Sequence, residues 1–407
     1  QGTSATHGAP LGDDEISAAR EKLDWPHPPF EIPEAILGAW RTAGQAGGKA
    51  HAAWKEKLAA LEGATRESFE AILSGDLPAN TVVALNAHKS QISADAPKWA
   101  TRKSSQEALE VLTEQVPAMI GGSADLTGSN NTKTAATVPI SVDDFGGRYI
   151  YYGVREHAMA AVMNGMALHG GFMPYGGTFL TFTDYCRPSI RLSALMGLRV
   201  VYVMTHDSIG LGEDGPTHQP VEHIASLRAI PNLNVFRPAD AVETAECWLL
   251  ALENITTPSV LVLTRQGVPT IRTEHTDENL SARGAYVIAD ADGARQATIL
   301  ATGSEVEIAL AARELLQADG IATAVVTMPC WELFDQQPEA YRAEVLGKAG
   351  TRVAVEAAAC FGWARYGVSE AKVIGMRSFG ASAPIAGLYD HFGITPQAVA
   401  DAVRAEL

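Results

Sequence analysis

The sequence of 407 residues has few cysteines, no long apolar run and no excess of positive charge, and each of these absences excludes a class of protein. The four cysteines, Cys186, Cys247, Cys330 and Cys360, are widely spaced and form no C-x-x-C pair, which favours buried thiols in a reducing compartment over a disulfide framework. No apolar stretch reaches the roughly 18 to 20 residues that a membrane helix needs. The first residues carry no basic segment followed by an apolar one. We therefore expect a cytoplasmic protein that makes no contact with a membrane.

Negative charge dominates the composition, with a formal net charge of -16. Such a surface repels nucleic acid and anionic membranes, so we expect neither as a partner. An anionic ligand must then be bound by a few locally placed cations. Basic residues in loops are therefore informative.

The pattern of residues predicts an α/β protein with three parts. Residues 1–94 read as a mostly helical tail and linker, with helices near 34–61 and 65–74 after a proline-rich connector, "WPHPPFEIP". Residues 95–275 alternate apolar strands such as "RYIYYG", "LRVVYVMT" and "SVLVLTR" with helices such as "EHAMAAVMNGMALHG" and "AVETAECWLLALE". This alternation is typical of a parallel sheet covered on both faces. Functional residues should then lie in loops at the carboxyl ends of its strands.

A second αβ domain with a parallel sheet is predicted over residues 283–407. "QATILATG", "IATAVVTMP" and "TRVAVEA" read as strands. The helix between the first two should begin with a capping box at Ser304 and Glu307 and end at Gly320. Few ionisable groups cluster in this sequence, so we expect the domain to support structure or assembly rather than chemistry.

One loop, "THDSIGLGEDGPTHQP" at residues 205–220, holds two histidines, three carboxylates and three glycines directly after a predicted strand. A metal site would place its ligands at close helical or strand spacing, whereas His206 and His218 are separated by a loop. A solvated polar loop is the second interpretation. The third, which the glycines favour, is a substrate-binding loop whose backbone approaches its ligand closely.

Two further segments lie at strand ends. Glu156, in "YYGVREHAM", falls where a strand gives way to a helix, so it is either a helix-capping carboxylate or a functional one. Phe179, Phe182 and Tyr185, in "GGTFLTFTDY", recur at helical spacing, which is more often a core stripe than a cofactor pocket.

Cations and a hydroxyl occupy three other loops rich in small residues. Arg102 lies in "ATRKSSQ", Ser129 in "GGSADLTGSN" and Arg265 in "LTRQG". Together with His206 they would suit a phosphomonoester, because guanidinium forks bind phosphate oxygens in pairs.

Taken in order and spacing, "GTSATHGAPLG", "GGSADLTGSN", "YGVREHAM", "TFLTFTDY", "THDSIGLGEDGPTHQPVEHIASLRAIPN", "LTRQ", "ATGSEV" and "FGASAP" resemble the transketolase family. The resemblance spans all 407 residues. It corresponds to the end of the diphosphate-binding domain, the pyrimidine-binding domain and the C-terminal domain of that family.

The resemblance implies a transferase of the pentose phosphate pathway that uses thiamine diphosphate to move a two-carbon ketol unit from a ketose phosphate to an aldose phosphate. Glu156 would hydrogen-bond the ring nitrogen of the aminopyrimidine and promote its imino tautomer from a dry pocket that favours proton sharing. Phe179, Phe182 and Tyr185 would form the aromatic wall on that ring, against the interpretation as core. Asp125 would lie near the cofactor at the interface of a homodimer.

The substrate residues follow by the same resemblance. Arg102, Ser129, His206 and Arg265 would bind the phosphate of the sugar. Asp214 would contact a sugar hydroxyl, and His7 and His218 would hold substrate hydroxyls and help to move protons. These assignments leave the 205–220 loop without a metal.

The sequence departs from the family in one respect, since no G-D-G occurs in the 407 residues. That motif carries the Mg²⁺ that holds the diphosphate, so we expect the metal ligands outside this chain, on an N-terminal diphosphate-binding domain or polypeptide. Dihydroxyacetone synthase and phosphoketolase share the scaffold and are alternatives. A third alternative is an inactive fragment that folds and dimerises without cofactor.

Overall fold

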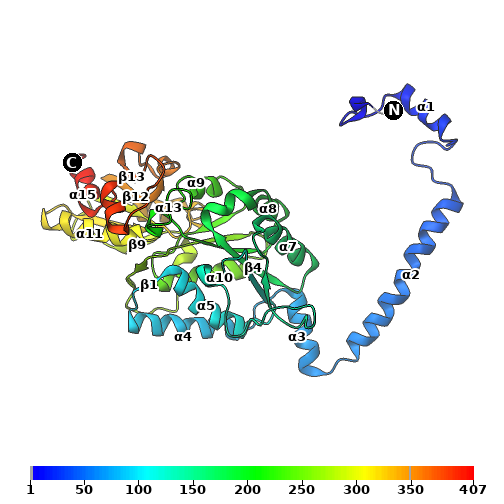
Figure 1. Cartoon of the computed structure of the whole chain (residues 1–407), viewed down its shortest axis with the longest axis horizontal. Helices are drawn as coiled ribbons and strands as arrows, with labels where there is room; N and C mark the ends of the chain where they lie inside the picture. Colours follow the sequence, from blue (N-terminus) through cyan, green and yellow to red (C-terminus); the bar gives the residue numbers. More distant parts are fainter. Residues whose placement is uncertain (1–2, 348–349) are drawn as a thin grey trace. The chain divides into compact units, whose positions relative to one another are not determined.

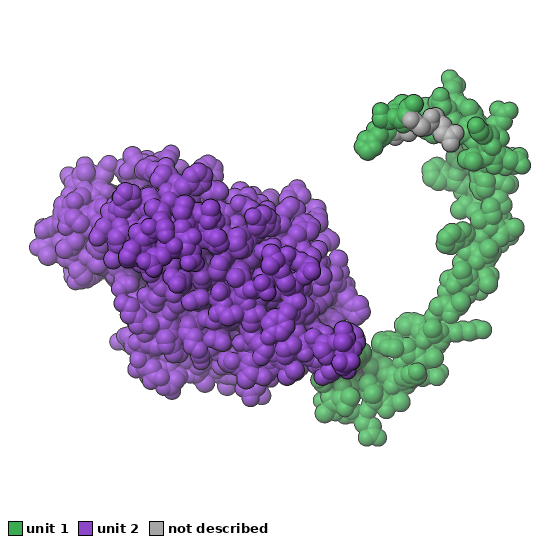
Figure 2. Space-filling view, in the orientation of Figure 1, with its two compact units in different colours: residues 1–69 green, residues 70–407 purple. Residues whose placement is uncertain are grey.

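The computed structural model describes residues 3–347 and 350–407, which divide into two compact units, residues 1–69 and residues 70–407 (Figure 2). The first unit contains η1 (Ser4–Thr6), α1 (Asp13–Lys22), α2 (Glu34–Ala59) and the start of α3 (Gly63–Ser74). The proline-rich connector between α1 and α2 is not helical, as predicted. Neither α1 nor α2 has a buried residue.

The second unit contains a six-stranded sheet whose strands are all parallel, in the order β3-β2-β4-β5-β7-β6. The strands are β2 (Met119–Ser123), β3 (Tyr149–Tyr151), β4 (Met173–Phe179), β5 (Val201–Thr205), β6 (Asn234–Phe236) and β7 (Ser259–Leu263). Every residue of β2, β4, β5, β6 and β7 is buried, because helices cover both faces. The predicted parallel sheet is therefore confirmed.

Alternation along the strands divides the core into two layers. Val201 and Val203 of β5 enter one layer, and Tyr202 and Met204 enter the other. The first layer is covered by α4 (Asn80–Asp95), α5 (Thr101–Gln115) and α10 (Ala241–Glu253), and the second by α7 (Glu156–His169), α8 (Thr183–Met196) and α9 (His223–Arg228). Figure 1 shows α7 and α8 packed side by side. Each buried aliphatic side chain of β5 contributes about 1.5–3 kcal/mol to this packing.

A five-stranded sheet forms the C-terminal part of the unit, in the order β13-β12-β10-β11-β9. Its strands are β9 (Tyr286–Ala289), β10 (Ala297–Ala301), β11 (Thr323–Thr327), β12 (Thr351–Ala359) and β13 (Val373–Met376). Four are parallel and β9 runs antiparallel at the edge. One face packs against α11 (Glu305–Ala318) and α15 (Pro396–Arg404), and the other against a cluster that includes Trp331 and Trp363.

Shorter elements complete the second unit. They are β1 (Trp99–Ala100), β8 (Gly267–Val268), α6 (Thr127–Asn130), α12 (Trp331–Asp335), α13 (Glu339–Leu346), α14 (Ile385–His391), η2 (Leu180–Phe182), η3 (Ile209–Leu211), η4 (Leu280–Arg283), η5 (Trp363–Tyr366) and η6 (Glu370–Lys372). The pair β1 and β8 is antiparallel and joins the start of α5 to the segment after β7.

The start of α11 differs from the prediction. Ser304 has helical backbone angles, φ -59° and ψ -22°, and makes no capping hydrogen bond, so the capping box with Glu307 is wrong. The Ser304 hydroxyl donates instead to Oε1 of Glu305, at 2.8 Å. The other end is as predicted, because Gly320 follows the helix in the left-handed region with φ 77°.

All four cysteines are buried free thiols, which confirms the prediction made for them. Burial raises the pKa of Cys186 to about 12, so this thiol is not a reactive nucleophile. Among the helices that the structure describes, none combines the length and the apolar character needed to cross a bilayer.

Candidate functional site

Most of the predicted site residues come together at one edge of the six-stranded sheet. His206 directly follows β5, Arg265 lies two residues after β7, and Asp125 lies two residues after β2. Because the strands are parallel, their carboxyl ends share one edge, where ligands of such sheets bind. Asp125 has a left-handed backbone, with φ 63°, and its side chain is exposed. His7 belongs to the first unit, where it follows η1 and is exposed.

Two arginines of the site have their guanidinium groups fixed by backbone carbonyls. Arg102, in the first turn of α5, donates from Nη1 to the carbonyl oxygen of Ser129 at 2.7 Å. Arg265 donates from Nη1 to the carbonyl oxygen of Leu211 at 2.7 Å. Burial, together with the positive charge of Arg265, lowers the pKa of Arg102. The two cations are therefore close enough to repel each other, an arrangement that an anion between them would stabilise.

His206 lies beside these cations and is 3% exposed. Burial, followed by electrostatic interactions with Arg102, Arg265 and His218, lowers its pKa to about 3. Its imidazole is therefore neutral near pH 7. Within the part of the chain that the structure describes, Nδ1 of this ring is buried without a hydrogen-bond partner. Such an orphaned polar atom is costly unless a ligand satisfies it.

An aromatic wall adjoins the cations. Phe179 ends β4, Phe182 lies in η2 and Tyr185 lies in α8, so the three rings come from three consecutive elements rather than from one helix. Adjacent ring centroids are 5.8 Å apart for Phe179 and Phe182 and 5.7 Å apart for Phe182 and Tyr185. The Phe179 ring lies 4.4 Å from that of His206, and the Phe182 ring lies 5.6 Å from that of His218. Phe182 is half-buried and Tyr185 is exposed, so the wall offers a free face.

Glu156 is the first residue of α7 and is buried, with 8% of its surface exposed. Its position favours a negative charge, because the helix dipole is positive there. Among the described residues, none donates a hydrogen bond or forms an ion pair with its carboxylate. Its neighbour His157 lies 3.3 Å from Oγ of Ser189 in α8, which places the start of α7 against the helix that carries Tyr185. Glu156 is thus an unsatisfied carboxylate close to the aromatic wall.

The glycine-rich loop brings Asp214 and His218 to the same edge. Gly212 and Gly215 have φ 90° and 86°, a conformation that side chains disfavour, so the turn depends on glycine at both positions. Nδ1 of His218 lies 2.9 Å from the Thr217 hydroxyl, and Asp214 is exposed. The Gln219 side chain links this loop to the C-terminal segment, because its Nε2 donates to the carbonyl oxygens of Gly212 and Ala381, at 2.9 and 2.8 Å.

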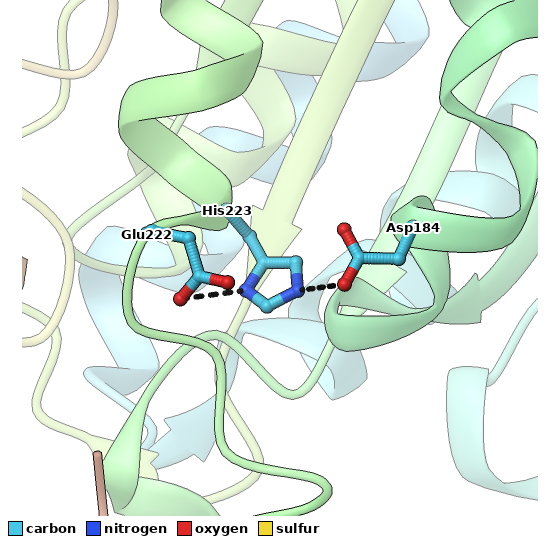
Figure 3. Close-up of side chains that lie close together, drawn as sticks. All are labelled: Asp184, Glu222 and His223. Atoms are coloured by element: carbon cyan, nitrogen blue, oxygen red, sulfur yellow. Dashed lines mark hydrogen bonds and ion pairs between the residues drawn. The ribbon is translucent and has the colours of Figure 1, made fainter.

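One cluster with metal-ligand geometry was not predicted from the sequence. It consists of Asp184, Glu222 and His223, whose donor atoms lie within 4.8 Å of one another. Figure 3 shows the imidazole between the two carboxylates, with Nε2 3.1 Å from Asp184 and Nδ1 3.9 Å from Glu222. Because the two ring nitrogens face different carboxylates, the donors do not converge on one point. We interpret the trio as an ion-pair cluster that ties α8 to α9 when His223 is protonated.

A second unpredicted cluster lies between the two sheets. Arg237 contacts Asp207, Glu305 and Glu356, and all four side chains are at most 1% exposed. Two of these carboxylates belong to the C-terminal domain. Ionisable groups that are scattered along the sequence of that domain thus come together in the fold. Asp207 belongs to the 205–220 loop, but its ion pair with Arg237 joins residues that are far apart in sequence, and no short motif predicts such a pair.

Comparisons with known proteins agree over nearly the whole chain. Residues 1–78 match the family model "Transketolase, thiamine diphosphate binding domain", residues 97–270 match "Transketolase, pyrimidine binding domain", and residues 284–395 match "Transketolase-like TK C-terminal domain". A transketolase from Cereibacter sphaeroides is 58% identical over 407 residues, which is 100% of this chain and 61% of that protein. The chain thus spans about three fifths of the length of such a relative.

Solved structures give the same result. A transketolase from Leishmania mexicana superposes with a TM-score of 0.89 at 42% identity, covering 98% of this chain and 58% of that one. A transketolase from Pichia stipitis in complex with sedoheptulose-7-phosphate superposes with a TM-score of 0.89 at 38% identity, covering 98% of this chain and 59% of that one.

The match over residues 1–78 bears on the expectation of a missing domain. The absence of G-D-G predicts that the metal ligands lie on an N-terminal diphosphate-binding domain or polypeptide outside this chain. Residues 1–78 themselves match the model of the thiamine diphosphate binding domain, so the comparisons do not support its absence from this chain.

Proposed function

The chain belongs to the transketolase family, and we propose that it acts as a transketolase, transferring a two-carbon ketol unit from a ketose phosphate to an aldose phosphate with thiamine diphosphate, in the pentose phosphate pathway. The observation that carries the proposal is that a cluster of Arg102, Arg265 and neutral His206 lies against an aromatic wall. An anion site and a flat apolar surface together suit a phosphorylated substrate held beside an aromatic cofactor.

The residues present fit thiamine diphosphate. Glu156 is buried without a partner, and Phe182 and Tyr185 leave ring faces accessible beside it. We assign the pyrimidine ring to this wall, with the Glu156 carboxylate on a ring nitrogen and Asp125 nearby. When bound, the cofactor supplies the electron sink that ketol transfer requires.

Glu156 does its work as a proton-holding group. With the cofactor bound, its carboxylate would hydrogen-bond the ring nitrogen and share a proton with it. The wall formed by Phe179, Phe182 and Tyr185 fixes the ring against this carboxylate.

At the opposite end, Arg102 and Arg265 bind the phosphate of the sugar, with Ser129 beside Arg102. Two guanidinium groups match the charge of a phosphomonoester dianion. Neutral His206 lies beside these arginines, so it can donate a hydrogen bond to a phosphate oxygen without adding a third fixed charge.

Between these ends, Asp214 and His218 address the sugar hydroxyls. His7, which belongs to the first unit, is likewise proposed to hold a substrate hydroxyl and to help move protons. The His218 ring lies edge-on to the aromatic wall, 5.6 Å from the ring of Phe182. This contact, together with the influence of His218 on the pKa of His206, supports a position for it between the aromatic wall and the phosphate cluster.

The proposal includes magnesium, a homodimer and a cytoplasmic location. A hard dication suits the several negative charges of a diphosphate, and no residue named above is assigned as its ligand. The dimer is supported by apolar side chains that α7 and α8 expose: Val162, Leu168, Leu192, Leu195 and Met196, from 41% to 70% exposed. A patch of this kind on a soluble chain favours a protein contact. The reduced, buried thiols support the proposed cytoplasmic location, because the cytoplasm is a reducing compartment.

The test is Glu156→Gln in the enzyme assayed with thiamine diphosphate, magnesium and a ketose phosphate donor. We expect ketol transfer to be lost while circular dichroism shows an unchanged fold, because the amide keeps the shape of the side chain but cannot take the proton. Glu114→Gln, at an exposed position of α5, is the matched control and should retain full activity. Near-normal turnover in Glu156→Gln would contradict the assigned role.

A further inference from the structure

Arg237 is a fully buried cation that joins the two sheets of the second unit. It follows β6, and its Nη2 donates to Oδ2 of Asp207 at 2.8 Å. Its Nη1 donates to Glu305 and, at 3.0 Å, to the carbonyl oxygen of Thr302. This one guanidinium group therefore contacts both the pyrimidine-binding part of the unit and the C-terminal domain.

Asp207 connects this contact to the phosphate cluster, because it is the residue after His206. Burial raises the pKa of Asp207, and the charge of Arg237 opposes that rise. The Ser208 hydroxyl donates to the other carboxylate oxygen at 3.1 Å. Any movement of Asp207 would break these bonds and carry the backbone of His206 with it.

Glu305 is held in place by other groups of the C-terminal domain. Its Oε1 accepts from the hydroxyls of Ser304 and Tyr389, at 2.8 and 2.9 Å. Its Oε2 accepts from the backbone N–H of Ala357 at 3.0 Å. With three donors on its two oxygens besides Arg237, Glu305 is a rigid anchor rather than a mobile counter-ion.

The segment that carries Arg265 also contacts the start of α11. Gln266, the residue after Arg265, donates from Nε2 to the Ser304 hydroxyl at 3.1 Å. The segments that carry His206 and Arg265 are therefore both tied to Ser304 and Glu305 at the start of α11. This contact also explains why Ser304 does not cap its helix, since its hydroxyl is engaged by two side chains.

We propose that Arg237, Glu305 and Ser304 are positioning residues that set the separation of His206 and Arg265, so that the C-terminal domain determines affinity for the phosphate of the substrate. This inference rests on the proposed function, and it assigns the C-terminal domain a part in substrate recognition without a residue that touches substrate. A phosphate needs its donors within a few tenths of an ångström of their hydrogen-bonding positions, so small shifts of either loop weaken binding.

The test uses inorganic phosphate as the probe and the NMR signal of ¹³C-labelled His206 as the reporter, so it does not depend on turnover. In the unaltered protein, phosphate should shift this signal with a measurable dissociation constant. Glu305→Gln should raise that constant at least tenfold, and the milder Ser304→Ala severalfold. In the kinetic assay both should raise KM for a ketose phosphate with kcat nearly unchanged, and should leave KM for an unphosphorylated ketose unchanged.

The matched control is Glu246→Gln, which disrupts another buried ion-pair cluster, formed with Lys89 and Arg272. The other side-chain partner of Glu246 is Ser281, which lies outside the loops that carry His206 and Arg265. It should lower stability without changing phosphate affinity. Unchanged phosphate affinity in folded Ser304→Ala and Glu305→Gln would overturn the positioning role. A different failure, in which phosphate never shifts the His206 signal of the unaltered protein, would overturn the phosphate site itself.

Discussion

His206 should remain neutral through the pH range in which ordinary histidines titrate. Burial is the largest cause of its lowered pKa, about 3, and the positive charges of Arg102 and Arg265 add to it. At pH 6 an imidazole with the usual pKa of about 6.5 is about three-quarters protonated, whereas one with a pKa of about 3 is protonated to only about 0.1%. The difference is large enough to decide between the two states in a single titration.

The assay is a titration of the ¹³C-labelled histidine ring signals from pH 8 to pH 5, with the His206 signal identified by its loss in His206→Gln. The signal should hold its neutral position throughout. In Arg265→Met the pKa should rise, because one repelling charge is gone, yet stay below 6.5, because burial remains. Arg365→Met, which removes a half-exposed guanidinium in the C-terminal domain, should leave the signal unchanged.

A midpoint near pH 6.5 for His206 in the unaltered protein would refute the electrostatic reasoning. The sign of the linked effect on stability is also fixed. Because the folded state lowers the pKa, the unfolded chain takes up a proton at His206 that the folded chain refuses. The contribution of His206 to stability is therefore present above about pH 6.5 and is lost as the pH falls toward 3.

Three other predictions follow from the site and its supports. Arg265→Ala should raise KM for ketose phosphates by the equivalent of about 1.5–3 kcal/mol, the free energy of a hydrogen bond to a charged group. An equal rise in KM for unphosphorylated ketoses would mean that Arg265 does not bind the phosphate. Leu195→Asp, which puts a charge on the apolar surface of α8, should convert the proposed dimer to monomer in size-exclusion chromatography with light scattering, and a dimer that persists would place the interface elsewhere. Glu246→Gln should lower the free energy of unfolding in urea by about 3 kcal/mol, because it leaves buried Lys89 and Arg272 without their partner; unchanged stability would show that water already screens the cluster.

The sequence predicts those features that depend on neighbours along the chain. The strand "LRVVYVMT" and the loop after it are predictable because, in a parallel sheet, an apolar run followed by glycines and polar residues is typical of a buried strand and the loop at its carboxyl end. The helix "AVETAECWLLALE" is likewise found at Ala241–Glu253. Periodicity misleads at Phe179, Phe182 and Tyr185, whose helical spacing suggests a core stripe, because a strand end, a 3-10 turn and a helix start happen to share that spacing.

What the sequence does not predict depends on partners that are distant along the chain. The pattern S-x-x-E at Ser304 is a sound local signal for a capping box, yet the hydroxyl is used by Glu305 and Gln266 instead. Arg237 and Glu305 are 68 positions apart and meet only because two sheets pack together. Likewise, His223 meets Asp184, 39 positions earlier, because the start of α9 lies beside the start of α8. Long-range ion pairs leave no periodic pattern, so composition and spacing miss them.

The arrangement of charges explains how a buried acidic cluster can support a site that binds anions. Three carboxylates, Asp207, Glu305 and Glu356, surround Arg237. The first of them, Asp207, directly follows His206 in the sequence. Unpaired, they would pull the pKa of His206 upward and offset the attraction of Arg102 and Arg265 for phosphate. The groups that shift His206 are instead its burial, those two arginines and His218, and no carboxylate of the cluster is among them. Arg237, with Arg228 on the far side of Glu356, neutralises most of the negative charge where it arises. The domain contact therefore stays rigid through strong ion pairs, while the field at the phosphate position remains that of the two arginines.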